Sequence, residues 1–334
     1  MDIEFHYYIT YIIALRANFS PEEAYKIAYS CQHTDINQFP YTIAGKDGSY
    51  ENYISQSENI TKPKEEMLRV YPLFHFCPGT LDEVVAYHQK YPRRDGKLHS
   101  FNTVPGNKNA KALMDTALKS NNLYRIGIAS HLLADTYSHQ NFVGFKDEYN
   151  AMKGTLEKLL PRIGHTEAMF KPDWQAYSWT DERFVSQCSG INNKERFLEA
   201  SGCIFDAYCV HTSLANADSA KSSLLKDLGD AIGRVTTRYV DSTKRIGAYK
   251  SLAGCEFKEY RKDDWFDSAI RYEADPQKIG VDDSARLYFW EDQDKFSDTD
   301  WYQFQEAVKA HQKEAEKVLQ PVLAMTAIPD HRNW

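Results

Sequence analysis

The chain has little that would draw it to a polyanion or into a membrane. Its 334 residues include 40 Lys and Arg against 47 Asp and Glu, giving a formal net charge of -7 at pH 7. Since no global positive field exists, no stable nucleic-acid complex is expected. No stretch approaches the ~20 apolar residues of a membrane-spanning helix. The first residues include acidic Asp2 and Glu4 where a signal peptide is basic, so we expect neither a transmembrane segment nor a signal peptide.

Cysteine pairs, repeats and familiar catalytic motifs are also lacking. The six cysteines form no CxxC pair and lie mainly in apolar segments, which is typical of buried free thiols in a reducing compartment. This predicts a cytoplasmic protein and leaves a non-classical export route open. There is no phosphate-binding glycine loop, no GxSxG elbow and no Cys/His protease signature. The 22 Tyr and 17 Phe residues exclude a disordered or fibrous chain.

The spacing of apolar residues is helical almost throughout, and strand-like alternation is nearly absent. Ser20 with Glu23, and Thr80 with Glu83, are capping boxes that predict helices ending near Gln32 and Tyr91. Further helices are expected over residues 5–16, 64–71, 107–120, 122–142, 147–160, 193–217, 219–246 and 298–320, the last stopped by Pro321. The sequence therefore predicts an all-α multi-helix bundle with loop insertions at residues 40–63, 92–106 and 161–181.

The strongest candidate for a metal-binding motif is GIASHLLADTYSHQNF, which places His131, Asp135 and His139 four residues apart. Each step of four turns a helix by ~40° and climbs ~6 Å, so the three side chains share one stripe. The two histidines are then ~12 Å apart along the axis and cannot share one ion. Asp135 lies between them. The spacing therefore suits two cations, each with one histidine, with Asp135 in a bridging position.

Burial supports a cation at this motif. The neighbouring residues make the helix apolar on most faces, where an unpaired ionised carboxylate is costly and a bound cation removes the cost. The alternative is that Asp135 forms a buried ion pair with one histidine while the other lies at the surface.

Further ligands must come from other segments, because each metal needs at least three protein groups. The candidates are His6 in EFHYY, Asp35 after the helix that ends near Gln32, His75 between aromatic residues, and His165 in the loop 161–181. Each of these is, on its own, as compatible with a structural role as with a ligand role. Together they complete two sites. His33, which lies near Asp35, is an alternate ligand.

The order of these residues resembles the ligand order of the zinc-dependent phospholipase C and S1/P1 nuclease superfamily. FHYYITYIIA, SPEEAYKIAYSCQ and HLLADTYSHQNFVG are more closely similar to an uncharacterised bacterial domain of unknown function, over roughly residues 1–175. The superfamily resemblance implies an all-α fold with up to three zinc ions. We expect the metal site in a domain over residues 1–250, with residues 251–334 as a helical or irregular extension packed on it.

Two features depart from that superfamily: the start of the chain, and the spacing of the motif, in which His139 follows only four residues after Asp135. Its better-known members use an N-terminal tryptophan as a metal ligand, and this chain begins MDIEF. Either Glu4 or Asp2 replaces that ligand, or the third metal position is lost. The acidic ligand expected after His165 is Glu167 or Asp173.

The resemblance implies hydrolysis of a phosphate ester by a metal-activated water, with two or three zinc ions, or iron or manganese. The expected ligands are His6, Asp35, His75, His131, Asp135, His139, His165 and Glu4, with Asp35 and Asp135 as the catalytic residues. Phospholipids, nucleic acids and small phosphodiesters all remain as substrates, and the oligomeric state is open. The alternatives are amide hydrolysis or oxygen activation at the same site, or a helical interaction protein with a structural metal or a buried His/Asp network.

Overall fold

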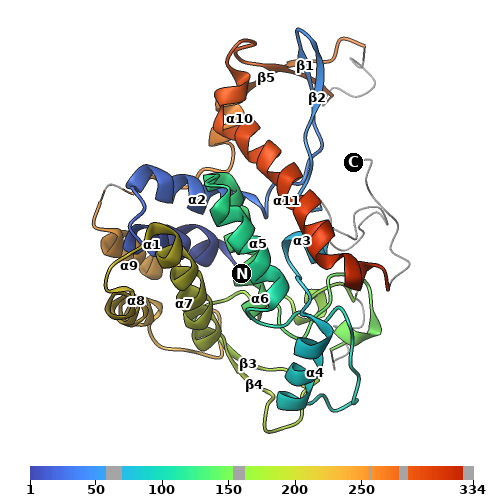
Figure 1. Ribbon diagram of the computed structural model, residues 1–334, viewed down its shortest axis with the longest axis vertical. Helices are drawn as coiled ribbons and strands as arrows, with labels where there is room; N and C mark the ends of the chain where they lie inside the picture. The colour runs from blue at the N-terminus through green and yellow to red at the C-terminus, as the bar shows by residue number, and fades with distance from the viewer. Residues whose placement is uncertain (58–69, 153–161, 256, 278–284, 326–334) are drawn as a thin grey trace.

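The computed structural model describes residues 1–57, 70–152, 162–255, 257–277 and 285–325. Its helices pack around α6 (Leu123–Ser138), which contacts α2 (Pro21–His33), α5 (Lys108–Lys119), α7 (Asn193–Thr212) and α11 (Asp300–Leu323) (Figure 1). Most of the helix predicted over 64–71, and much of that over 147–160, falls outside the described residues. None of the described helices combines the length and apolar character that a membrane crossing requires.

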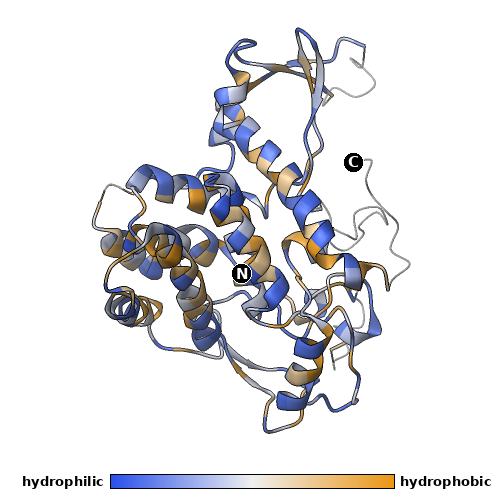
Figure 2. Cartoon of the chain, in the orientation of Figure 1, coloured by the Kyte–Doolittle hydropathy of each residue, from blue (hydrophilic) through white to orange (hydrophobic). Residues whose placement is uncertain are grey.

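The remaining helices surround this centre. They are η1 (Glu4–Ile9), α1 (Thr10–Arg16), α3 (Val70–Phe74), α4 (Leu81–Lys90), α8 (Ala217–Ile232), α9 (Thr243–Ala253), α10 (Asp264–Ala269) and the short turns η3 (Glu148–Asn150), η5 (Thr166–Ala168) and η6 (Phe296–Asp298). Both predicted capping boxes are present, at the starts of α2 and α4. Figure 2 shows bands of hydrophobic and hydrophilic residues along α4 and α11, as expected for helices with one buried face.

Two small sheets make the all-α prediction wrong. β1 (Thr42–Gly45), β2 (Gly48–Glu51), β5 (Ile270–Ala274) and β6 (Arg286–Trp290) form a mixed sheet in the order β2-β1-β6-β5, at one end of the molecule (Figure 1). β1 pairs in parallel with β6, and the other neighbours are antiparallel. The second sheet pairs β3 (Ser178–Thr180) with β4 (Gly190–Asn192). These strands are too short to produce a clear alternating pattern, and β1 finds its partner in a distant part of the chain.

Several predicted helix ends also differ from the structure: the helices predicted over 122–142 and 193–217 end at Ser138 and Thr212, and two further differences have a clear local reason. The helix expected over 219–246 is two helices, because α8 ends at Gly233, whose φ of 75° favours glycine and interrupts the helix. Pro321 does not stop the last helix: α11 continues to Leu323. The proline lies in the final turn, and only two helical residues follow it.

A glycine sets the distance between α2 and α6. A Cβ atom at Gly127 would lie 2.4 Å from the carbonyl oxygen of Ile27 and 2.5 Å from the Cβ of Ser30. Only glycine therefore permits this approach of the two backbones. One turn beyond Gly127, the Nδ1 atom of His131 lies 2.8 Å from the carbonyl oxygen of Cys31. The close packing of α2 against α6 thus positions a histidine of the predicted motif.

Candidate metal centre

Asp135 on α6 is the centre of a buried cluster of histidines and carboxylates. Its side chain is about 1% exposed. Its Oδ1 atom lies 3.2 Å from Nε2 of His6, and its Oδ2 atom lies 3.3 Å from Nδ1 of His75 and 3.2 Å from Nε2 of His131. The single carboxylate thus contacts three imidazoles that come from η1, the end of α3 and α6.

Asp35, His75 and His131 form one group with the geometry of metal ligands. Nε2 of His131 lies 2.9 Å from Nδ1 of His75, and Oδ1 of Asp35 lies 3.6 Å from each of these two nitrogens. For bonds of about 2.0–2.1 Å, neighbouring ligand atoms of a tetrahedral zinc ion are about 3.3 Å apart. The spacing in this group is therefore close to that of a coordination shell.

A second group lies beyond the end of α6. His139 is the residue that follows the last turn, and its Nε2 atom lies 3.2 Å from Oδ1 of Asp173. The other carboxylate oxygen of Asp173 lies 3.4 Å from Nε2 of His165. Nδ1 of His139 is also 3.6 Å from Oδ2 of Asp135. His131 and His139 thus belong to different groups, with Asp135 between them, in the arrangement that the four-residue spacing predicts.

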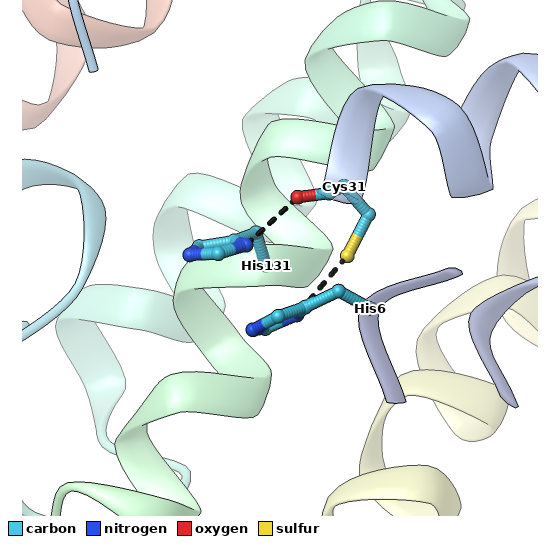
Figure 3. Close-up of side chains that lie close together, drawn as sticks. All are labelled: His6, Cys31 and His131. Carbon is cyan, nitrogen blue, oxygen red and sulfur yellow. Dashed lines mark hydrogen bonds between the residues drawn. The ribbon is translucent and has the colours of Figure 1, made fainter. Parts of the chain in front are cut away.

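His6 lies against the first group with a different partner on each side of its ring. Its ring stacks on that of His131 at a centroid separation of 3.9 Å, and its Nδ1 atom faces the Sγ atom of Cys31 at 3.5 Å. Figure 3 shows the outer nitrogens of the two stacked rings on the same side, away from Cys31. His6, Cys31 and His131 lie close enough to form a third group, but the Cys31 carbonyl already occupies Nδ1 of His131. The Cys31 thiol therefore contacts Nδ1 of His6 and leaves Nε2 of that ring directed at the carboxylates.

The remaining histidines are held in the same way, by a backbone carbonyl on one ring nitrogen. The oxygen of Ser55 lies 2.9 Å from Nε2 of His75, that of His75 lies 3.0 Å from Nδ1 of His139, and that of Met169 lies 2.8 Å from Nδ1 of His165. A carbonyl oxygen only accepts hydrogen bonds, so each of these nitrogens carries the N–H and the opposite nitrogen presents a lone pair. Histidines that bind metal are oriented in this manner.

The charges of the cluster favour a cation. Burial alone would raise the pKa of Asp135, but the neighbouring His139 imidazole and the Met1 amine hold it well below its usual range. Burial lowers the pKa of His131, yet Asp135 and Asp35 raise it well above the ordinary value. Burial lowers the pKa of His6 to about 3, which leaves this ring neutral. The carboxylates thus attract positive charge, and His6 supplies a neutral ligand nitrogen.

The amine of Met1 reaches the cluster, which the sequence did not predict. Its nitrogen lies 2.5 Å from Oδ1 of Asp135 and 3.4 Å from Oδ1 of Asp173, so it joins the two groups. Glu4 is placed elsewhere: its two carboxylate oxygens accept hydrogen bonds of 2.8 and 2.7 Å from Arg245. The Oδ1 atom of Asp2 accepts a hydrogen bond from the backbone of Glu4. The hydrogen bonds of Glu4 and Asp2, the two residues expected to replace the N-terminal ligand, are thus made to groups outside the cluster.

Of the two acidic residues expected after His165, Asp173 lies in the cluster and Glu167 does not. The Glu167 carboxylate accepts hydrogen bonds from Arg162 and from the backbone of Met152. Likewise His33, the alternate ligand, packs against Phe304 at a centroid separation of 4.9 Å. No spacing rule distinguishes Asp173 from Glu167 in the sequence, because both follow His165 within an irregular loop.

A cavity of about 400 Å³ opens onto the cluster. Its lining includes metal-ligand candidates, among them Asp35, whose side chain is 28% exposed. The lining also includes the apolar or aromatic side chains of Tyr71, Phe76, Met169 and Phe170, and the ring of Phe76 stacks on that of His139. Met169 has a φ of 56°, an unusual value for a residue other than glycine, and its carbonyl is the one that holds His165. The cluster is therefore accessible to a small molecule.

Comparison with known proteins gives one match. Residues 1–319 match a family model described as a family of unknown function (DUF6765), so the likeness continues well past residue 175, where we expected it to end. No curated protein and no solved structure matches the chain. The resemblance to the phospholipase C and P1 nuclease superfamily finds no support in these comparisons, whereas that to a domain of unknown function is confirmed. The chain belongs to the family of unknown function DUF6765.

Proposed function

We propose that this protein is a metal-dependent hydrolase of phosphate esters. The observation that carries the proposal is the orientation of the histidines: each turns one ring nitrogen to an outer carbonyl or thiol and the other toward the carboxylates of Asp35, Asp135 or Asp173. Such an arrangement leaves lone pairs directed at one another unless positive charge lies between them. The order of the ligands along the chain, similar to that of the zinc-dependent phospholipases C, supports the same proposal.

The residues divide into two principal ligand sets. Asp35, His75 and His131 would hold one cation, and His139, His165 and Asp173 a second, with Asp135 between them. His6, whose Nε2 atom lies 3.2 Å from Oδ1 of Asp135, would provide a donor for a third ion. Imidazole and carboxylate donors suit zinc, and also iron or manganese. Bound cations would lower the pKa of a water molecule and neutralise charge on phosphate oxygens.

Asp35 and Asp135 have different roles in this proposal. Asp135 is fully buried and surrounded by imidazoles, so it can hold and bridge cations but cannot reach a substrate. Asp35 lines the cavity and is partly exposed, so its carboxylate can orient an incoming water molecule and accept its proton. The apolar or aromatic side chains of Tyr71, Phe76, Met169 and Phe170 in the lining favour an ester that carries an apolar group next to the phosphate.

Metal content and hydrolysis measured on the same preparations test the proposal. Protein purified without chelator should contain two or more equivalents of zinc, iron or manganese and should hydrolyse bis(p-nitrophenyl) phosphate. Asp135→Asn should lose the metals together with the activity, whereas Asp35→Asn should retain more metal but lose activity. Asp206→Asn is the matched control, because Asp206 is an exposed carboxylate that pairs with Lys221.

The alternative is an interaction protein in which a metal or a His/Asp network only stabilises the bundle. The cavity that opens onto the ligands favours catalysis, since a structural metal site is closed. A preparation with no bound metal would exclude the hydrolase. One tightly bound metal with no hydrolysis of generic phosphoesters, amides or peptides would favour the structural role.

A further inference from the structure

A second cavity, of about 600 Å³, lies between the segment that follows α2 and the segment that contains α10 and β5. Residues 36–39 form one wall, residues 262–272 contribute another, and Trp301 at the start of α11 also lines it. It shares no lining residue with the cavity at the metal centre. Its volume falls within the range of about 300–1,000 Å³ that is usual for small-ligand sites.

Aromatic rings line this cavity and remain open to solvent at its edge. The ring of Tyr41 packs against that of Phe266 at a centroid separation of 4.8 Å, and Trp301 lies behind both. Phe39 and Tyr272 are 46% and 57% exposed. Exposed apolar surface that continues into a cavity is a common feature of ligand and partner sites. They provide flat apolar surfaces within reach of a bound molecule.

The polar side chains of the cavity are free to bind a ligand. Lys262, Asp263 and Asp267 line the cavity and are exposed, and among the described residues their ammonium and carboxylate groups form no hydrogen bond and no ion pair. His33 also lines it, and the Nδ1 atom of this buried imidazole has no hydrogen-bond partner in the described part of the chain. The cavity thus offers hydrogen-bond donors and acceptors, and side chains of both charges.

We propose that this cavity binds a neutral polyhydroxylated ligand of the size of one or two sugar rings. A hydroxyl group both donates and accepts, so it can satisfy Lys262 and the two aspartates alike. The C–H faces of a sugar ring would pack against the exposed rings of Phe39 and Tyr272. An anion would face Asp263 and Asp267, and a cation would face Lys262, so a charged ligand fits less well. The inference does not depend on the function of the metal centre.

Saturation-transfer NMR on the full chain tests this site. The probes are glucose, galactose, mannose, N-acetylglucosamine, maltose and lactose at millimolar concentration, with tetramethylammonium and inorganic phosphate as charged probes. At least one sugar should give signals that saturate with concentration. The signals should fall at least severalfold in Tyr272→Ala and in the double variant Asp263→Asn/Asp267→Asn, and should persist after metal has been removed by chelation.

The controls are Tyr239→Ala, which removes an equally exposed tyrosine elsewhere, and Asp218→Asn, which removes a carboxylate on α8. Both should bind sugar like the unmodified protein. Absence of signal from every sugar with folded protein would overturn the proposal. Unchanged binding in both cavity variants, or binding of tetramethylammonium or phosphate in place of sugars, would overturn it as well.

Discussion

The Nε2 atom of His131 and the Nδ1 atom of His75 lie 2.9 Å apart, and the opposite nitrogen of each ring faces a backbone carbonyl oxygen. If both carbonyls accept an N–H, the two facing nitrogens present lone pairs to each other. Two lone pairs at this distance repel unless a proton or a metal ion lies between them. This pair of residues therefore makes the stability of the fold depend on bound positive charge.

The first prediction is that metal stabilises the folded protein. Chelation should lower the free energy of unfolding, and added zinc should restore it by about 2.7 kcal/mol when free zinc is about 100 times the dissociation constant of a site. Urea unfolding with chelator and with buffered zinc measures the difference. His75→Gln should respond less to zinc than the unmodified chain. Equal stability with and without zinc would contradict a metal centre.

The second prediction concerns the close approach of α2 and α6. Gly127→Ala should destabilise the protein by about 1–3 kcal/mol, because the new Cβ would overlap the carbonyl of Ile27. It should also weaken zinc binding, because it displaces the Cys31 carbonyl that orients His131. Gly247→Ala is the control: that helical glycine has open space around it, and alanine there should be neutral or stabilising. Similar effects of the two substitutions would refute this role of Gly127.

The third prediction concerns the buried pair of Glu4 and Arg245. Arg245→Met should destabilise the protein by roughly 3 kcal/mol or more, because it leaves the Glu4 carboxylate, which is 2% exposed, without its partner. Lys226→Met, which removes an exposed pair with Asp230, should change stability by about 1 kcal/mol or less. Chemical denaturation of both variants provides the comparison. If Glu4 were instead a metal ligand, Glu4→Gln would reduce the metal content, and we expect it unchanged.

The fourth prediction concerns pH. Burial lowers the pKa of His311 to about 4 from its ordinary 6.5, and its ring donates to the carbonyl of Leu73. Between these values the unfolded chain binds a proton that the folded chain does not, so this residue makes stability fall as the pH falls from 6.5 to 4. His311→Gln can keep the hydrogen bond and should reduce that loss by roughly 3 kcal/mol. Urea unfolding at several pH values measures how the free energy of unfolding changes with pH. The same change in His311→Gln as in the unmodified chain would show that His311 is not responsible.

The sequence predicted most of the helices because their signals are local. The capping boxes at Ser20 and Thr80 depend on side chains three residues apart, and both are present in the structure. The spacing of His131, Asp135 and His139 likewise depends on one helix. The sheet could not be predicted in this way, since β1 and β6 contribute only short strands and pair across most of the chain.

The same distinction holds for the site. His6 and His75 could be listed from the sequence because imidazole side chains among apolar and aromatic residues are uncommon, and Asp35 and His165 because they lie where a helix end meets a loop and in an irregular loop. Their grouping could not be derived, since it depends on how η1, α2, α3 and α6 pack together. Asp173 could not be separated from Glu167, and the Met1 amine carries no sequence signal at all. Glu4 was expected among the ligands only because it is acidic and near the start of the chain.

The pairing of β1 with β6 has a consequence for the order in which the protein folds. Ile43 lies beside Tyr288 in that pair, so the β1–β2 hairpin is made early in synthesis and finds its neighbouring strand only after more than two hundred further residues. The candidate ligands, from His6 to Asp173, are synthesised before that strand. Because contacts so distant in sequence form slowly, the hairpin edge stays unpaired while the ligand cluster can already assemble. An unpaired strand edge can pair with another chain, so the edge of β1 is open to such association until the strand around Tyr288 has been made and has docked, whether or not the ligand cluster has formed.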